Sequence, residues 1–421
     1  MRYHLRKYGR PAGKRGKVPG ILLIIVLLAA FLTALLYRPA PGTKAVAVSS
    51  GVPDSTGKIS SADSETPSPG SSSAKDVSIT ILGAGDDLIH SNVYKQAAKR
   101  TGGKGYDFTP VYSHVAGQIR AADIAVVNQE TVLAGKVLPP SNYPLFNSPV
   151  EVGDALVQAG FDVINHANNH ILDMGEKGIR ATLDYWDTKP VKVVGVYRND
   201  ADRENIRVVE AKGIKTAHIG ITEMTNGMYL PKGSPYRIVY AKDTALIEHL
   251  IKKARNLADV VVISVHWGTE DTYELTENQK KLAQQMVDWG ADIIFGNHPH
   301  VVQKLTLLTR ASDGAKCPVI FALGNFVSAQ LYGRNMVSGL LTVTVTKSGK
   351  TGKTSYSGMK FTPIVTHYGS GFSNITIYPF RQYTDAMAAQ HGVRKQTRNF
   401  SRAFIQKIID GSIPKQYQDL S

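Results

Sequence analysis

Short apolar segments alternate with helix-length amphipathic segments between residues 77 and 375, and this alternation constrains the fold more than any other feature. Eight segments have the length and composition of strands: 77–82, 124–127, 162–164, 191–196, 215–221, 260–265, 292–295 and 319–323. Strands separated by helices are typical of an α/β domain, because parallel neighbours need a crossover connection. With 43% hydrophobic residues among 421, the chain can bury the large core that such a domain requires.

The clearest predicted helix spans residues 277–289, where Thr276 can cap the first turn together with Gln279. Because this helix joins two apolar segments, we expect a βαβ unit with parallel strands. Alternating apolar residues between Ser338 and Val365 predict an antiparallel portion of the sheet. Residues 393–409 predict a basic surface helix.

The net charge of +15 is concentrated at the two ends of the chain. Residues 1–19 contain seven Lys or Arg and no acid, and residues 376–421 contain seven against three Asp, so the remainder holds only 15 − 7 − 4 = +4. A nucleic-acid-binding domain would instead carry a basic stripe on its folded surface. The charge distribution therefore favours a membrane topology signal, and we expect no nucleic-acid partner.

Residues 21–36 are sixteen consecutive residues without a charge, and they follow a basic tail. This pattern predicts a transmembrane anchor over residues 20–37, with the basic segment 1–19 in the cytoplasm and the main domain outside the cell. A cleaved signal peptide is the alternative, but the A-x-A-like site Ala45-Val46-Ala47 lies well past the apolar run. We therefore expect a single-pass protein of the cell membrane.

The next segment, residues 38–76, is rich in Pro, Gly and Ser and has almost no large apolar residue. It cannot bury enough apolar surface to offset its ordering entropy, so we expect a disordered linker. The folded domain is predicted at residues 77–375, and a basic helical extension at 376–421. A single cysteine, Cys317, excludes an internal disulfide.

Polar residues follow five of the predicted strands at the point where each strand ends. These segments are Gly85-Asp86 with His90, Asn128-Gln129-Glu130, Asn165-His166-Ala167-Asn168-Asn169-His170 with Asp173, His266-Trp267-Gly268-Thr269-Glu270, and Gly296-Asn297-His298-Pro299-His300. Because the carboxyl ends of the strands share one edge of an open α/β sheet, we expect these segments to meet. Six of the twelve histidines lie in them, which chance would rarely produce.

The ligand types in these segments are imidazole, carboxylate and amide oxygen, without a thiolate. This set suits one or two Mn, Zn or Fe ions better than calcium or a structural zinc site. Asp173 can fix the tautomer of His170, which can in turn donate a proton to a leaving group. A lone histidine after a strand is more often a hydrogen-bonded structural residue, so the metal prediction depends on the segments meeting at one place.

Six motifs, in this order, resemble the CapA/PgsA family of capsule biosynthesis proteins. They are Gly85-Asp86, Asn128-Gln129-Glu130, Asn168-Asn169-His170 with Asp173 and Gly175, His266-Trp267-Gly268 with Glu270, Gly296-x-His298-Pro299-His300, and Leu323-Gly324-Asn325-Phe326. The resemblance covers residues 77–375. It implies an α/β fold related to the calcineurin-like metallophosphatases, a four-layer α/β/β/α sandwich, preceded here by one N-terminal transmembrane helix.

The resemblance also implies roles for individual residues. The implied metal ligands are Asp86, Glu130, Asn169, His266, His298 and His300, the catalytic residues are His170 and Asp173, and the substrate-binding residues are Asn128, Asn168, Glu270 and Asn325. Two positions depart from the metallophosphatase motifs. His90 is displaced from the Asp-x-His motif, and Asn128-Gln129-Glu130 stands in place of a bridging Gly-Asp-x-x-Asp motif, while His166 lies outside the motifs altogether.

The function implied by the resemblance is that of a membrane-anchored, extracytoplasmic component of bacterial poly-γ-glutamate capsule synthesis and export. Its implied partners are membrane-bound synthase or export subunits and the anionic polymer. A second hypothesis is a metal-dependent phosphoesterase acting on an extracytoplasmic envelope substrate, favoured by the His266, His298 and His300 set but disfavoured by the altered bridging motif. A third is a cell-surface module that only binds polymer.

Overall fold

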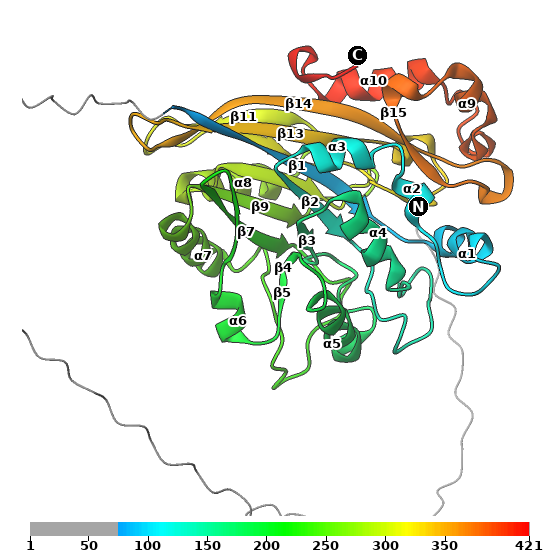
Figure 1. The fold of residues 1–421 in the computed structure, drawn as a ribbon, viewed down its shortest axis with the longest axis horizontal. Coiled ribbons are helices and arrows are strands. Elements are labelled where there is room, and N and C mark those ends of the chain that lie inside the picture. Colours follow the sequence, from blue (N-terminus) through cyan, green and yellow to red (C-terminus); the bar gives the residue numbers. More distant parts are fainter. Residues whose placement is uncertain (1–74, 421) are drawn as a thin grey trace, which may run out of the picture. The chain divides into compact units, whose positions relative to one another are not determined.

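The computed structural model describes residues 75–420, which lie in one compact unit (Figure 1). The predicted cytoplasmic segment, the anchor at 20–37 and nearly all of the linker at 38–76 lie outside the described residues. Between residues 75 and 420, no helix is both long enough and apolar enough to span a bilayer.

The first of two large sheets has seven strands in the order β15-β14-β13-β1-β2-β3-β4. Their bounds are β1 Val77–Asp87, β2 Ile124–Gln129, β3 Val163–Asn165, β4 Lys192–Val194, β13 Val337–Lys347, β14 Thr354–His367 and β15 Thr376–Pro379. Strands β1 to β4 are parallel to one another, whereas β13, β14 and β15 add antiparallel neighbours on the other side of β1. The antiparallel portion predicted from residue 338 is therefore confirmed.

The second large sheet has six strands in the order β11-β12-β10-β9-β7-β6. Their bounds are β6 Arg207–Ala211, β7 Ile214–Thr222, β9 Val260–His266, β10 Ile293–Asn297, β11 Leu305–Thr309 and β12 Lys316–Ile320. The four central strands are parallel, and each edge strand is antiparallel to its neighbour. Strands β5 (Val196–Tyr197) and β8 (Arg237–Ile238) form a separate two-stranded ribbon.

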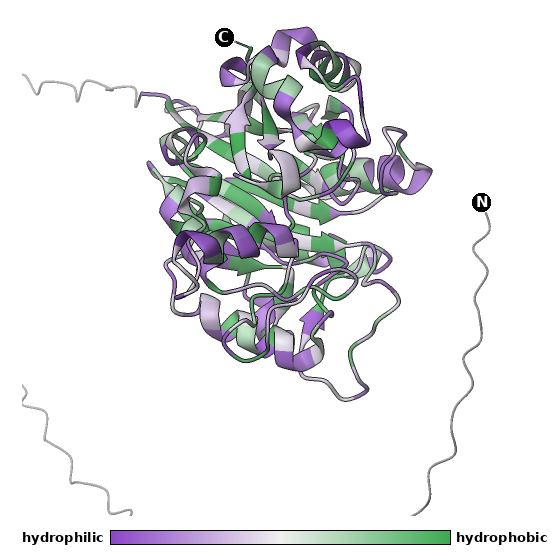
Figure 2. Cartoon of the chain, turned by 90° about the vertical axis from the view of Figure 1, so that its right-hand side faces the viewer, coloured by the Kyte–Doolittle hydropathy of each residue, from purple (hydrophilic) through white to green (hydrophobic). Residues whose placement is uncertain are grey.

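The two large sheets pack face to face, with apolar side chains of both in one buried cluster. The side chains of β9 alternate between two hydrophobic cores. Val260 and Val262 belong to the cluster shared with the first sheet, while Val261 and Ile263 belong to a second cluster. Successive side chains of a strand point to opposite faces. Figure 2 shows these hydrophobic strands inside the domain.

Helices α7 (Thr244–Leu257) and α8 (Glu277–Trp289) cover the outer face of the six-stranded sheet. The predicted helix at 277–289 is confirmed, and Thr276 and Gln279 form a capping box that satisfies orphan N–H groups of its first turn. Figure 1 shows α2, α3 and α4 alongside the seven-stranded sheet, and their buried residues join its core. The bounds of the remaining helices are α1 Ser91–Arg100, α2 Thr109–Tyr112, α3 Ala116–Ala121, α4 Glu151–Ala159, α5 Gly175–Trp186, α6 Asp200–Glu204, α9 Asp385–Gln390 and α10 Arg402–Ser412, and 3-10 turns lie at 333–336, 370–372, 380–382, 392–395 and 415–417.

Two predictions about regular structure were wrong in detail. The strand predicted over 191–196 is broken at Gly195, whose φ is 92° and which separates β4 from β5. A Cβ there would lie 2.4 Å from the backbone N of Ala167, so the chain must bend where it passes the next polar loop. The basic surface helix predicted over 393–409 is a 3-10 turn followed by α10, in which Ile405 and Ile409 are buried.

Gly83 of β1 packs closely against the second sheet, since a Cβ on this residue would lie 2.6 Å from the Phe295 ring of β10. We expect Gly83→Ala to lower the free energy of unfolding by about 1–3 kcal/mol through overpacking. Gly117→Ala is the matched control, because no atom lies within 4 Å of its Cβ position. Urea unfolding followed by tryptophan fluorescence measures both, and equal midpoints for the two variants would contradict the sheet contact.

Candidate metal centre

The carboxyl ends of β1, β2, β9 and β10 bring the predicted ligands together, because the two sheets meet along this edge. Register pairs Asp86 of β1 with Asn128 of β2, and His266 of β9 with Asn297 of β10. The strands therefore run further than the apolar segments predicted, and their ladders hold the polar residues in place. All of these side chains are buried.

Five of the six predicted metal ligands form two overlapping clusters whose ligand atoms lie within 4.8 Å of one another. One cluster contains Glu130, His266 and His298, and the other contains Asp86, Glu130 and His300. His266 Nε2 lies 3.0 Å from His298 Nδ1 and 3.5 Å from Glu130 Oε1. His300 Nδ1 lies 3.3 Å from Asp86 Oδ2. Glu130 is common to both clusters, at the place where the sequence departs from the bridging motif.

Both carboxylate oxygens of Glu130 are buried and have no hydrogen-bond partner. An unpaired carboxylate in the interior is costly, and a bound cation is one way to compensate it. The sixth predicted ligand, Asn169, directs Oδ1 to 3.0 Å from His266 Nε2. Imidazole nitrogens around carboxylate and amide oxygens fit a divalent ion such as Zn, Mn or Fe. The residues present therefore suit a divalent metal.

The charge states in the centre follow from burial and neighbours. Burial lowers the pKa of His298 to about 3 and holds the pKa of His266 well below its usual value, so both are neutral and can offer a lone pair at pH 7. Burial also opposes a charge on His300, but Glu130 and Asp86 outweigh it and raise its pKa to about 10. Burial, followed by repulsion from Asp86, raises the pKa of Glu130.

The loop after β10 holds two ligands in a backbone conformation that non-glycine residues seldom adopt. The φ angle is 97° at His298 and 57° at His300. Such positions cost of order 1–3 kcal/mol and concentrate at functional sites. Gly296 permits the loop to begin close to the backbone at Phe321, since a Cβ there would lie 1.9 Å from the Phe321 carbonyl oxygen.

Asn128 and Asn325 lie against the metal-type ligands. Asn128 donates from Nδ2 to Asp86 Oδ1 at 2.7 Å, and its amide nitrogen also lies 3.3 Å from His266 Nδ1. Asn325 Oδ1 lies 2.9 Å from His300 Nδ1. Hydrogen bonds of this kind orient ligands and fix tautomers. The predicted substrate-binding role of these two residues stays a prediction, because the contacts that the structure shows are with the ligands.

His170 and Asp173 form the predicted pair beside the clusters. His170 Nδ1 lies 2.7 Å from Asp173 Oδ2, and the Phe146 backbone N–H donates to the same oxygen at 2.6 Å. Asn168 Oδ1 accepts from the His170 backbone N–H at 3.1 Å, and the Phe146 ring packs edge-on against the imidazole. The pair is thus held in one orientation, with Nδ1 engaged by the carboxylate. Such an arrangement suits a proton donor acting through Nε2.

The other histidines predicted near the site lie outside both clusters. His166 Nε2 accepts a hydrogen bond from the Trp186 indole at 2.8 Å, which is a structural contact. His90 lies 3.2 Å from the Leu88 carbonyl oxygen through Nδ1 and packs against Phe146. Exposed Glu270 acts on the centre through its charge, which raises the pKa of both Glu130 and His300.

A cavity of about 380 Å³ adjoins the centre. Its lining includes Asn335, which donates to the His300 carbonyl oxygen, and Gln330, which accepts from Asn325. The lining residues are His90, Ser91, Asn92, Asn142, Asp271, Ala329, Gln330, Leu331, Tyr332, Asn335 and Phe372. Asp271 is the one carboxylate among them, Lys and Arg are absent from the lining, and Asp271 pairs with Arg334 at 3.1 Å.

Sequence reasoning missed two residues that shape the site. Asn165 donates to Asn128 Oδ1 at 2.9 Å and so supports the residue that holds Asp86. Its place as the last residue of a strand in an asparagine-rich segment is a usable signal. Phe146 reaches His170 from a long loop, and its sequence surroundings carry no comparable signal.

A buried cluster of histidines and carboxylates at the carboxyl edge of two mixed sheets defines the chain as an α/β protein with a candidate divalent-metal centre. Residues 80–330, more than half of the chain, match the family described as bacterial capsule synthesis protein PGA_cap, and the chain belongs to this family. The resemblance seen in the motifs is confirmed. Family membership supports a role in capsule synthesis.

Two relatives show how far the similarity extends. The Capsule biosynthesis protein CapA of Bacillus anthracis is 31% identical over 276 residues, which cover 62% of this chain and 63% of the relative. The chain thus spans less than two thirds of that protein's length. The PGA biosynthesis protein CapA of Bacillus subtilis is 28% identical over 323 residues, covering 75% of this chain and 77% of the relative.

Similar solved structures include a novel phosphatase from Mycoplasma pneumoniae and the NAD nucleotidase of Haemophilus influenzae. The first has a TM-score of 0.41 at 16% identity, covering 69% of this chain and 94% of that one. The second has a TM-score of 0.44 at 12% identity, covering 80% of this chain and 60% of that one. Both TM-scores lie below 0.5, so these likenesses carry no information on the site.

Metal binding at pH 7 should release protons, because a His300 with a pKa near 10 carries a proton that a cation must displace. Calorimetric titration of Zn or Mn in buffers of different ionisation enthalpy is expected to give at least about one proton released per ion, since the pKa of Glu130 is raised as well. Glu130→Gln should weaken binding at least about tenfold, because it removes the carboxylate that both clusters share.

The matched control is His114→Ala, which changes an exposed histidine stacked on Tyr378, and it should leave metal affinity unchanged. A binding heat that does not depend on the buffer would contradict the protonated state of His300.

Proposed function

We propose that this chain is a membrane-anchored, outward-facing component of bacterial poly-γ-glutamate capsule synthesis and export, and that its buried centre holds a divalent metal. The family match over residues 80–330 supports the capsule role. The polymer follows from the B. subtilis relative, whose name assigns it to PGA biosynthesis. The observation that carries the metal-dependent part is Glu130, a buried carboxylate without a hydrogen bond that is shared by two histidine clusters.

The proposed topology places residues 1–19 in the cytoplasm and residues 20–37 in the membrane. Its support is the uncharged run at 21–36 behind seven basic residues. A linker over residues 38–76 would then hold the folded domain outside the cell, where an exported polymer is handled. The proposed partners are membrane-bound synthase or export subunits.

We propose that the site has a metallophosphatase-like arrangement, within a four-layer sandwich of the calcineurin-like class. A divalent ion held by Asp86, Glu130, Asn169, His266, His298 and His300 would supply Lewis-acid chemistry when bound. His298 and His266 are neutral and ready to coordinate, while Asn128 and Asn325 hold the neighbouring ligands in place.

A second candidate function is metal-dependent phosphoester hydrolysis of an envelope substrate, and the His170–Asp173 pair favours it. Asp173 Oδ2 holds His170 Nδ1, which leaves Nε2 to deliver a proton to a leaving oxygen. A module that only binds polymer would have no need for an oriented imidazole beside the ligands. We propose that Asn168 and Glu270 act on the substrate side of this pair.

The capsule proposal predicts that cells carrying His298→Ala produce far less cell-surface poly-γ-glutamate than cells with the unsubstituted chain, because the metal loses a ligand. Polymer released by acid hydrolysis and measured as glutamate tests this, with immunoblotting to confirm equal amounts of protein. His249→Ala, which changes a half-exposed histidine paired with Glu204, is the control and should give normal polymer. Normal polymer in the His298→Ala cells would remove the metal centre from the proposed function.

The hydrolytic candidate predicts that the full-length chain in mild detergent cleaves a chromogenic phosphate ester when Mn or Zn is added. His170→Ala should lower kcat about 10²–10⁴-fold, because it removes the proton donor, while leaving metal affinity nearly unchanged. Equal loss of metal binding and activity would instead make His170 a ligand. Absence of hydrolysis by the unsubstituted chain with either metal would remove the enzyme candidate and leave the capsule role standing.

A further inference from the structure

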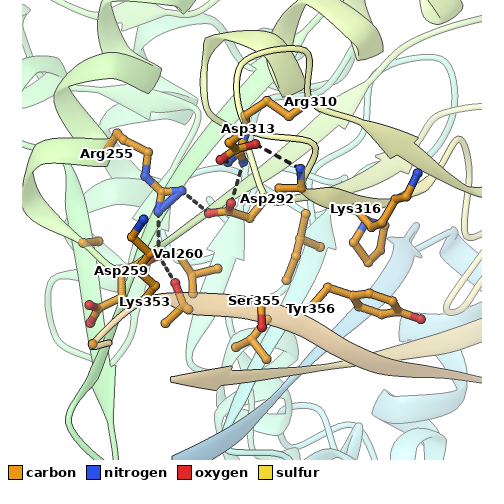
Figure 3. Close-up of a pocket in the computed structure, with 17 residues that line it drawn as sticks. Arg255, Asp259, Val260, Asp292, Arg310, Asp313, Lys316, Lys353, Ser355 and Tyr356 are labelled. Atoms are coloured by element: carbon orange, nitrogen blue, oxygen red, sulfur yellow. Dashed lines mark hydrogen bonds and ion pairs between the residues drawn. The ribbon is translucent and has the colours of Figure 1, made fainter. Parts of the chain in front are cut away.

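A cavity of about 620 Å³ lies at the other end of the strands from the metal centre. One wall contains the first residues of β9, β10 and β12, and the opposite wall is formed by β13, β14 and the hairpin between them. Figure 3 shows Arg255, Asp292, Arg310 and Asp313 on one side, with Ser355 and Tyr356 of β14 opposite. Since β9 runs from Val260 at this cleft to His266 at the centre, about 20 Å separates the two sites.

The cleft has a rigid charged wall. Both Arg255 and Arg310 bind the Asp292 carboxylate. Arg310 also donates to the Val287 and Ala291 carbonyl oxygens, at 3.0 and 2.9 Å. These guanidinium groups are thus occupied by the protein itself and fix the shape of the wall. Asp313 pairs with Arg310 as well, at 3.1 Å, so the two arginines face two carboxylates and are neutralised within the wall.

Two lysines at the cleft are freer. Lys316 and Lys353 are exposed lining residues, and the Lys316 ammonium donates to Thr309 Oγ1 at 2.7 Å. Within residues 75–420 no hydrogen bond or ion pair holds the Lys353 ammonium. Residues 314–384, which include both lysines, contain seven Lys or Arg and no Asp or Glu. Three carboxylates, Asp259, Asp292 and Asp313, also line the cavity, but they pair with Lys347, Arg255 and Arg310. Within the described residues no ion pair joins them to either of the two lysines.

The floor between the charged groups is apolar, with Val260, Ile293, Pro318 and Val345 lining the cavity. A γ-linked glutamate chain combines one carboxylate per residue with two backbone methylene groups, so it matches lysines above an apolar floor. The cavity beside the metal centre offers no such match, because the one charge in its lining is Asp271. A polycarboxylate would be repelled there and attracted to the cleft.

We infer that the cleft between the amino ends of β9, β10 and β12 and the β13–β14 hairpin binds a segment of poly-γ-glutamate, with Lys316 and Lys353 pairing with its carboxylates. This inference rests on the proposed function for the identity of the polymer. It places polymer binding and metal binding at different sites of one domain. The polymer binds at the amino ends of the strands, and the metal binds at their carboxyl ends.

The test uses the full-length chain in mild detergent and a fluorescently labelled γ-linked glutamate decamer, with binding measured by fluorescence anisotropy. The double variant Lys316→Glu, Lys353→Glu should raise Kd at least about tenfold at low salt, and added salt should weaken binding by the unsubstituted chain. Both lysines are exposed, so the melting temperature should not change.

The charge-matched control is Lys95→Glu, Lys99→Glu, which reverses two exposed lysines of α1, the helix that begins after His90 near the metal centre. It should bind the decamer like the unsubstituted chain. Binding lost in this control but retained in the cleft variant would overturn the inference and place the polymer at the centre, with the capsule role intact.

Absence of decamer binding by the unsubstituted chain would also overturn the cleft assignment. The proposed function would be judged separately, by polymer output in the His298→Ala cells. Failure of the cleft and failure of the capsule role are therefore distinguishable.

Discussion

Close backbone contact between the two sheets is the constraint on which the rest of the structure depends. A Cβ on Gly85 of β1 would lie 1.8 Å from the carbonyl oxygen of Gly324, in the segment between β12 and β13. A Cβ on Gly83 of β1 would lie 2.6 Å from the Phe295 ring of β10 in the other sheet. Glycine is needed where one backbone approaches another this closely. The end of β1 lies beside the loop after β10, where Asp86 Oδ2 lies 3.3 Å from both the His298 backbone N and His300 Nδ1.

Where the strand ends meet, electrostatic interactions rather than packing determine the charges of the buried metal-type ligands. Asp86 and Glu130 are fully buried, yet within the described residues their nearby cationic partner is His300. Burial and repulsion from Asp86 raise the pKa of Glu130, so a negative charge on both carboxylates is unfavourable for the folded chain alone. A divalent cation would compensate the negative charge of the two carboxylates, so their burial is understandable if the site binds a cation. The positive φ angles at His298 and His300 fit the same account.

The sequence predicted the site better than it predicted the boundaries of the strands. Asp86, Glu130, His266, His298 and His300 were found because each follows an apolar strand, and parallel strands end at a common edge. The predicted strand is broken at Gly195, which lies against Ala167, 28 residues earlier in the sequence. The hydrophobic pattern of residues 191–196 cannot predict a contact with so distant a residue. Phe146 packs against His170 from a distant part of the sequence. Ile405 and Ile409 are buried in a segment that the sequence predicts to be a basic surface helix, and this burial also depends on distant residues.

The separation of the cleft from the centre has a chemical reason. A chain of carboxylates is itself a set of oxygen ligands for divalent cations, so a polymer lying against an open metal site would compete with Asp86 and Glu130 for the ion. Full burial of these two residues, and the absence of Lys and Arg from the lining of the adjoining cavity, keep such a chain away from the centre. Lys316 and Lys353, which form no ion pair with the described residues, lie instead about 20 Å away, at the amino ends of the same strands. Because both ends belong to one pair of rigid sheets, polymer and metal can be held by a single domain without either displacing the other.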